Sequence, residues 1–199
     1  KVRRLVGKEK HKSMERELMR AGHADSLAVF DTDRFRAEQG LHPDCRVDFF
    51  NHHLAHALPT LFHTDWDDAL LYTSDGGGDN VQYSHRVLRD GRLETLYGGD
   101  EELTRPLRID SLGLAYGYAT QALGYRINRH EGKLTGLAAF GEPVLYQRMA
   151  GRFRVGDDGC IDSDFESYPA MRRFVFEAAA AISPADVAAS VQKLLEEKT

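Results

Sequence analysis

Two short clusters of metal- and phosphate-binding residue types lie between residues 51 and 79. The first reads Asn-His-His-Leu-Ala-His and contains His52 and His56, which are four residues apart. On a helix this spacing puts the two imidazoles one turn apart on the same face, where both can bind one cation. The second reads Asp-Gly-Gly-Gly-Asp, from Asp75 to Asp79. Together the two clusters indicate a metal–nucleotide site.

The glycine cluster follows an apolar run, which predicts a strand that carries Asp75 into a loop. Glycine has no side chain to keep an anion away, so its main-chain N–H groups can approach phosphate oxygens closely. Asp75 is then the third candidate metal ligand beside the two histidines. The candidate phosphate-binding residues of this loop are Gly76, Gly77, Gly78 and Asp79. The alternative is a glycine-rich hairpin loop with solvated acidic residues.

A third block, residues 129–141, reads Arg-His-Glu-Gly-Lys-Leu-Thr-Gly-Leu-Ala-Ala-Phe-Gly. It predicts a helix over residues 131–140, buried because small and apolar residues dominate it. Lys133 in the first turn opposes the helix dipole and therefore favours an anionic partner such as phosphate. His130 precedes this helix. His53 faces a different side of its own helix from His52 and His56, so it either supports the metal ligands from behind or faces the substrate. Both His53 and His130 are candidates for acid–base catalysis. The alternative for this block is a tightly packed core helix.

The elements that must position these residues follow from periodicity and turn signals. Asn51 is the expected N-cap of the histidine helix, and Asp90-Gly91 is a strong hairpin signal. The pattern indicates an α+β to α/β protein with one sheet, followed by helices. Helices are expected at residues 8–21, 34–39, 52–62, 111–124, 131–140, 144–149, 170–181 and 184–198, and strands at residues 46–50, 68–74, 81–88, 92–97 and 152–161, the last as a hairpin.

Composition narrows the classes of function. The chain has 199 residues, a net charge of −5 and 42% apolar residues, which is ordinary for a globular protein and argues against nucleic-acid binding. Cys45 and Cys160 are far apart and form no CxxC motif, so we expect neither a disulfide framework nor a cysteine zinc site, and we expect a reducing, cytoplasmic location. No apolar stretch approaches the roughly 20 residues that span a membrane, so no membrane partner is expected.

The three blocks, in this order and at these distances, resemble the O-carbamoyltransferases of nodulation-factor and antibiotic biosynthesis. The resemblance spans residues 46–197 and includes the last helix, Asp-Val-Ala-Ala-Ser-Val-Gln-Lys at residues 186–193. It implies an α/β, actin/Hsp70-like ATPase (ASKHA) fold related to the enzymes that transfer threonylcarbamoyl to tRNA. It also implies that residues 1–199 are a fragment of the N-terminal domain, truncated at both ends, without the second half of that fold and without a YrdC-like domain.

The resemblance further implies the chemistry. His52, His56 and Asp75 would bind a divalent cation of the Fe²⁺ type, which holds the phosphate of carbamoyl-adenylate. A YrdC-like domain would make that adenylate from carbamoyl phosphate and ATP. The acceptor would be a hydroxyl of a small molecule such as a sugar, a Nod factor or an antibiotic. His53 or His130 could take the proton from this hydroxyl, although a segment outside the chain is an equally good source.

Three functions stay open at this point. The first is a carbamoyltransferase fragment, inactive alone. The second is a metal-dependent ATPase or sugar-kinase-like protein of the same fold. The third is a non-catalytic binding module. Tyr116, Tyr118 and Tyr125 could line an acceptor pocket, but aromatic packing in the core is the alternative.

Overall fold

The computed structural model describes residues 31–199, and the helix expected at residues 8–21 lies outside this part of the chain. The architecture is mixed α/β, with small antiparallel sheets and helices. The described residues divide into two compact units. One comprises residues 31–73 and 78–107, and the other comprises residues 74–77 and 108–199.

The first unit is built around a three-stranded sheet in the order β1-β2-β3, as the predicted meander requires. Both connections are two-residue turns in which each residue has a positive φ: 52° and 65° at Asp79 and Asn80, and 48° and 70° at Asp90 and Gly91. Turns of this kind match the right-handed twist of paired strands. The strands are β1 (Ala69–Gly78), β2 (Val81–Arg89) and β3 (Arg92–Tyr97).

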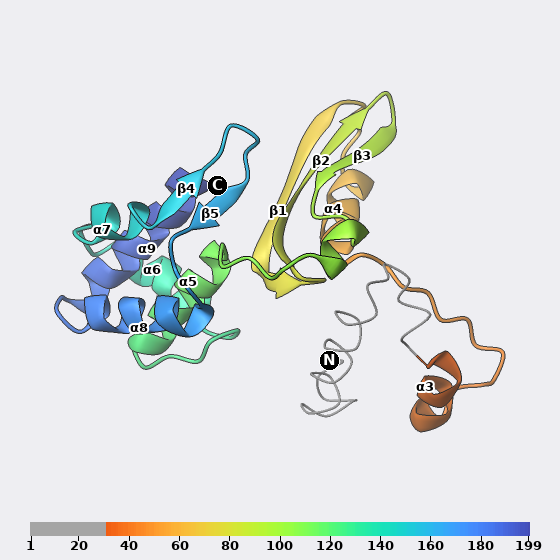
Figure 1. Cartoon of the computed structure of the whole chain (residues 1–199), viewed down its shortest axis with the longest axis horizontal. Helices are drawn as coiled ribbons and strands as arrows, with labels where there is room; N and C mark the ends of the chain where they lie inside the picture. The colour runs from red at the N-terminus through yellow and green to blue at the C-terminus, as the bar shows by residue number, and fades with distance from the viewer. Residues whose placement is uncertain (1–30) are drawn as a thin grey trace. The chain divides into compact units, whose positions relative to one another are not determined.

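Helix α4 (His52–Phe62) lies along one face of this sheet (Figure 1). Ala57 packs against Leu71 and Leu88 in a small hydrophobic cluster, which Leu61, Ala69 and Leu93 extend. Burial of these side chains fixes the helix on the sheet and thereby sets where its histidines lie. The first unit also contains α3 (Thr32–Gln39) and a 3₁₀ helix, η2 (Asp100–Thr104).

The second unit is mainly helical, and its central element is α9 (Pro184–Lys198). This helix begins as predicted, because Ser183 Oγ accepts a hydrogen bond from the backbone N–H of Asp186 at 3.1 Å. α9 packs against three other helices of the unit, α5, α6 and α7. The remaining elements are α5 (Leu112–Ala122), α6 (Glu131–Ala138), α7 (Tyr146–Ala150), α8 (Tyr168–Ala179) and the hairpin of β4 (Phe153–Val155) and β5 (Ile161–Ser163).

Side-chain hydrogen bonds hold the segment that leads into α5. The Tyr168 hydroxyl donates to the carbonyl oxygen of Arg108 at 2.9 Å, and Ser163 Oγ donates to that of Ile109. Burial, followed by the charge of Asp110, raises the pKa of Tyr168 above its ordinary value, so this hydroxyl stays a donor. Ser111 then caps α5 by accepting from the N–H of Leu114 at 2.9 Å.

Two local predictions are wrong. Residues 46–50 form no strand, and none of the strands in the described residues pairs with them. Phe49 and Phe50 are instead 38% and 67% exposed. Helix α6 is not buried, since Leu134 is its one buried residue. The two cysteines, Cys45 and Cys160, are not joined in a disulfide.

Candidate metal centre

Helix α4 begins at the histidine cluster because two side chains satisfy its first N–H groups. Asn51 Oδ1 accepts from the N–H of Leu54 at 2.9 Å, which confirms the predicted N-cap. Asp79 Oδ2 accepts from the N–H of His52 at 2.5 Å. A carboxylate at this position also interacts favourably with the helix dipole. These contacts fix the backbone on which His52 and His56 stand.

The three predicted metal ligands come together. His52, His56 and Asp75 each offer one ligand atom, and these atoms lie within 4.8 Å of one another. The Nε2 atoms of the two histidines are 3.2 Å apart. Two nitrogens that each lie roughly 2.1 Å from one ion, at angles of about 90–110°, would be about 3.0–3.4 Å apart. The same separation also allows one ring to donate a hydrogen bond to the other.

The donor set fits a divalent transition metal. Two imidazoles and one carboxylate suit Fe²⁺, which such a set binds while leaving coordination positions open for other ligands. His56 is exposed, and His52 and Asp75 are half-buried, so a substrate group can approach from solvent. The cluster therefore has the composition and the spacing of a metal site with free positions.

The three glycines do not form the expected loop. β1 continues through Gly78, and the turn is made by Asp79 and Asn80. A Cβ on Gly78 would lie 2.6 Å from Nδ1 of His52, so the absence of a side chain makes room for this imidazole. The N–H of Gly77 donates to Asp75 Oδ1 at 2.6 Å and orients that carboxylate. Gly77 and Gly78 thus position the side chains of two candidate metal ligands, Asp75 and His52.

Asp79 also has a role other than the expected one. Its carboxylate occupies the N-terminus of α4, where a phosphate would otherwise bind to the N–H groups. A second anion at the same position would be repelled. We therefore count Asp79 with the residues that cap the helix, and the prediction of phosphate binding by this side chain is not retained.

His53 is unsuited to the role of catalytic base. Its side chain is completely buried. Nδ1 lies 2.9 Å from Thr73 Oγ1 and Nε2 lies 3.3 Å from the carbonyl oxygen of Val81, so both ring nitrogens have partners. A base must reach the proton that it removes. The alternative of a supporting residue behind the metal ligands fits this environment.

His130 and Lys133 belong to the second unit. His130 is the residue before α6, and its Nδ1 accepts from the N–H of Arg126 at 3.2 Å. Lys133 Nζ lies 5.4 Å from the centre of the Tyr125 ring, in a cation–π contact at the exposed start of α6. The Lys133 side chain is accessible, and its role in phosphate binding stays a prediction.

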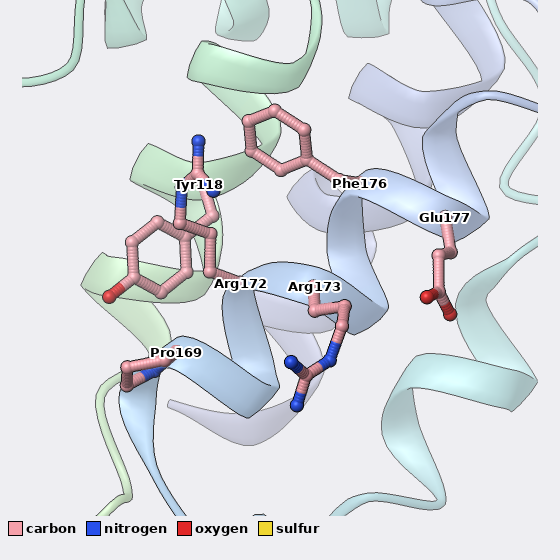
Figure 2. A pocket seen from close by; sticks show the side chains of 6 residues that line it. All are labelled: Tyr118, Pro169, Arg172, Arg173, Phe176 and Glu177. Atoms are coloured by element: carbon pink, nitrogen blue, oxygen red, sulfur yellow. The ribbon is translucent and has the colours of Figure 1, made fainter.

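An open pocket of 440 Å³ lies elsewhere in the second unit, along α8 (Figure 2). The guanidinium of Arg172 stacks on the Phe176 ring at 4.1 Å. Burial raises the pKa of Tyr118, and the charge of Arg172 lowers it in part. Tyr116, in contrast, is 7% exposed and belongs to the core. The predicted metal, phosphate and catalytic residues are not among those that line the pocket: Tyr118, Pro169, Arg172, Arg173, Phe176 and Glu177.

Comparison with known proteins identifies the class. Residues 41–198 match the family model of the carbamoyltransferase N-terminus. This match covers all of the elements from α4 to α9. The chain therefore belongs to the carbamoyltransferase N-terminus family.

The chain is also similar to longer proteins. It is 33% identical over 112 residues to the nodulation protein NolNO of Sinorhizobium fredii, which covers 54% of this chain and 15% of that protein. It is 34% identical over 99 residues to an uncharacterised protein of a Synechocystis species, covering 48% of this chain and 14% of the relative. An uncharacterised protein of Methanocaldococcus jannaschii is 31% identical over 93 residues, which cover 46% of this chain and 16% of that protein. The chain spans about one sixth of the length of these relatives.

Sequence reasoning missed one residue of the centre, Arg86. This arginine is 1% exposed, and it donates a hydrogen bond to Asn51 Oδ1 at 3.0 Å. The alternation of β2 carries the only available signal, because it places Arg86 on the same face as Ser84 and Leu88, which is the face that α4 covers.

Among the described residues, none of the helices is long and apolar enough to cross a membrane.

Proposed function

We propose that this chain is the metal-binding part of an ATP-dependent O-carbamoyltransferase with an actin/Hsp70-like fold. The enzyme transfers a carbamoyl group from carbamoyl-adenylate to a hydroxyl of a sugar, Nod-factor or antibiotic-type acceptor. The observation that carries this proposal is the convergence of His52, His56 and Asp75, whose ligand atoms lie within 4.8 Å. Membership of the carbamoyltransferase family supports the reaction class. Because ATP drives the reaction, we place it in the cytoplasm.

The reaction is the substitution of AMP by an alcohol. The acceptor oxygen forms a bond to the carbamoyl carbon, and the bond from that carbon to the phosphate oxygen breaks. AMP leaves with the electron pair, and the proton of the acceptor goes to a base. A divalent cation, Fe²⁺ by the donor set, would neutralise negative charge on the departing phosphate. The protein residues that would hold it are His52, His56 and Asp75.

The backbone beside these ligands completes the proposed phosphate site. Gly76 is exposed, and a Cβ there would make only an ordinary contact with Leu114, at 4.0 Å. We propose that the strand from Gly76 to Gly78 approaches the phosphate with bare backbone, and that Lys133 supplies a positive charge. The N–H of Gly77 is already donated to Asp75, so it serves this site through the carboxylate.

His130 is the remaining candidate for proton transfer in this chain. Since its Nδ1 accepts from the N–H of Arg126, the neutral ring carries its proton on Nε2. In this form the ring presents a donor, and it becomes a base only when the contact with Arg126 is released. His130→Gln tests this role, because a glutamine side chain keeps a polar group at the position but cannot take up the proton.

Labelled carbamoyl phosphate, given with ATP and candidate hydroxyl acceptors to the full-length protein, tests the function directly. We expect label in the acceptor and release of AMP, both abolished in His52→Ala/His56→Ala. We expect His130→Gln to lower turnover by about 100-fold, the size typical of general acid–base catalysis. Hydrolysis of ATP without label transfer to any acceptor would contradict the proposal and favour an ATPase. Activity that survives the double substitution would remove the metal site from the mechanism.

A further inference from the structure

We propose that Arg86 is a positioning residue for the candidate metal ligand His52, acting through the N-cap Asn51 before it and through His53 after it. The inference rests on the proposed role of His52 in metal binding. It concerns the buried side of α4, where His53 lies. Two hydrogen-bonded routes begin at the Arg86 guanidinium and lead to Asn51 and His53.

The first route leads to the N-cap. Arg86 Nη2 donates to Asn51 Oδ1 at 3.0 Å and to the carbonyl oxygen of Gly98 at 3.2 Å. The same Asn51 oxygen accepts the N–H of Leu54, and the Asn51 amide nitrogen donates to Asp100 Oδ1 at 3.1 Å. All polar atoms of the Asn51 side chain are therefore engaged, so its amide has one orientation. Arg86 thus holds the residue immediately before His52.

The second route leads to His53. Arg86 Nη1 donates to Ser84 Oγ, which lies 2.7 Å from Thr73 Oγ1, and Thr73 Oγ1 lies 2.9 Å from His53 Nδ1. His53 Nε2 lies 3.3 Å from the carbonyl oxygen of Val81. Together these contacts form a continuous chain from the guanidinium to the residue immediately after His52.

The direction of each hydrogen bond in this chain follows from its two ends. A carbonyl oxygen can only accept, so a neutral His53 ring carries its proton on Nε2 and accepts at Nδ1 from the hydroxyl of Thr73. Thr73 then accepts from Ser84, and Ser84 accepts from Arg86. The chain therefore has a single pattern of donors and acceptors, and it fixes both the tautomer and the orientation of His53.

The burial of Arg86 is costly. Burial lowers the pKa of Arg86 below its ordinary value, and the charges of Asp100 and Glu101 partly reverse this effect. Its Nε has no hydrogen-bond partner among the described residues. An apolar side chain at such a position is often at least as stable as a buried charge. Stability alone therefore does not explain an arginine here, whereas the fixed positions of Asn51 and His53 do.

Two matched pairs of variants test the proposal by Co²⁺ affinity, measured by titration calorimetry, and by the visible spectrum of the bound Co²⁺. Arg86→Met removes both routes, and Arg86→Lys keeps the charge but cannot serve both routes. Thr73→Val removes one hydroxyl at constant shape, and Thr73→Ser restores it. We expect Arg86→Met and Thr73→Val to lose about 10–100-fold in affinity, the size typical of groups that orient metal ligands. Arg86→Lys should resemble Arg86→Met, and Thr73→Ser should bind like wild type.

Circular dichroism and the thermal midpoint show whether each variant is folded. If Arg86→Met does not fold, the comparison of Thr73→Val with Thr73→Ser tests the proposal instead, because loss of one half-buried hydroxyl leaves the core intact. Folded variants that bind Co²⁺ with wild-type affinity and spectrum would overturn the proposal. Variants with a lower thermal midpoint but unchanged Co²⁺ affinity would also overturn the proposal, because that result would assign Arg86 a purely structural role.

Imidazole ¹⁵N NMR of the metal-free protein separates this inference from the proposed function. We expect the His53 signals of a neutral ring protonated on Nε2, and we expect Thr73→Val to change the signals of His53 and His52 but Thr73→Ser to preserve them. If wild type binds no Co²⁺ through His52 and His56, the proposed function fails while this readout still applies. Unchanged His52 signals in Thr73→Val would overturn the positioning role itself.

Discussion

The imidazole of His52 lies against the bare backbone of Gly78, which leaves no room for a side chain there. A Cβ on Gly78 would be 2.6 Å from His52 Nδ1, well inside van der Waals contact. The Asp79 carboxylate holds the N–H of the same histidine at 2.5 Å. The ring therefore has little freedom to move without losing its place beside His56 and Asp75.

Gly78→Ala should reduce metal affinity with little loss of stability. The added methyl group forces the His52 ring to rotate, which a side chain can do cheaply, but the rotated ring no longer lies 3.2 Å from His56. We expect a loss of about tenfold or more in Co²⁺ affinity by calorimetry, comparable with the loss of an orienting group.

Gly76→Ala is the matched control for this variant. It lies in the same strand, and its new Cβ would meet only Leu114, at 4.0 Å, an ordinary contact. Its metal affinity should stay close to that of wild type. Equal affinities in the two variants would mean that Gly78 does not position His52.

At the scale of elements, the start of α5 supports the strand segment that carries Asp75. A Cβ on Gly113 would lie 2.7 Å from the carbonyl carbon of Asp75 and 3.1 Å from the nitrogen of Gly76. The close approach of helix and strand backbone therefore requires glycine at this position. Ser111 fixes the register of the helix by capping it.

Gly113→Ala should both destabilise the protein and weaken metal binding. The methyl group meets main-chain atoms, which cannot move aside as a side chain can, so we expect a loss of about 1–3 kcal/mol in the free energy of unfolding. Urea denaturation measures this loss, and a Co²⁺ titration measures the displacement of Asp75.

Gly136→Ala, in the interior of α6, serves as the control for Gly113→Ala. It has open space around its Cβ and should stabilise the protein by up to about 1 kcal/mol through helix propensity. A Gly113→Ala protein as stable as the Gly136→Ala protein would show that α5 and the strand do not touch there.

Elements with local signals were predictable from the sequence. The N-caps Asn51 and Ser183 and the turn at Asp90-Gly91 act within a few residues, and the structure confirms them. Residues 46–50 have strand-forming side chains, but a strand also needs a neighbour to pair with, and sequence pattern does not show one. Three glycines were expected to end β1, yet the turn chemistry of Asp79 and Asn80 decides where it ends.

For the candidate site, too, the features set by local sequence were predictable, and those set by long-range packing were not. The His52–His56 spacing is a helical repeat, so the structure could bring both to one ion together with Asp75. The burial of His53 and Arg86 depends on the packing of α4 against β2, which is a contact between segments distant in sequence. Local pattern therefore predicted three candidate ligands that the structure brings together, whereas the hydrogen bonds behind them required the fold.

At the scale of the whole molecule, the chain belongs to the carbamoyltransferase N-terminus family but spans about one sixth of the relatives that it matches. Under the proposed function, this chain supplies the candidate metal ligands and the residues that position them. Metal binding should therefore be measurable separately from catalysis.

The central claim is that His52, His56 and Asp75 bind one divalent cation. Calorimetric titration of the metal-free protein with Co²⁺ or, without oxygen, Fe²⁺ tests it most directly, with His63→Ala as the control because His63 ends the same helix. We predict one equivalent of metal in wild type and in His63→Ala, and none in His52→Ala/His56→Ala or in Asp75→Asn at the same concentration. Binding that persists in the double variant, or that is absent from wild type, would contradict the account.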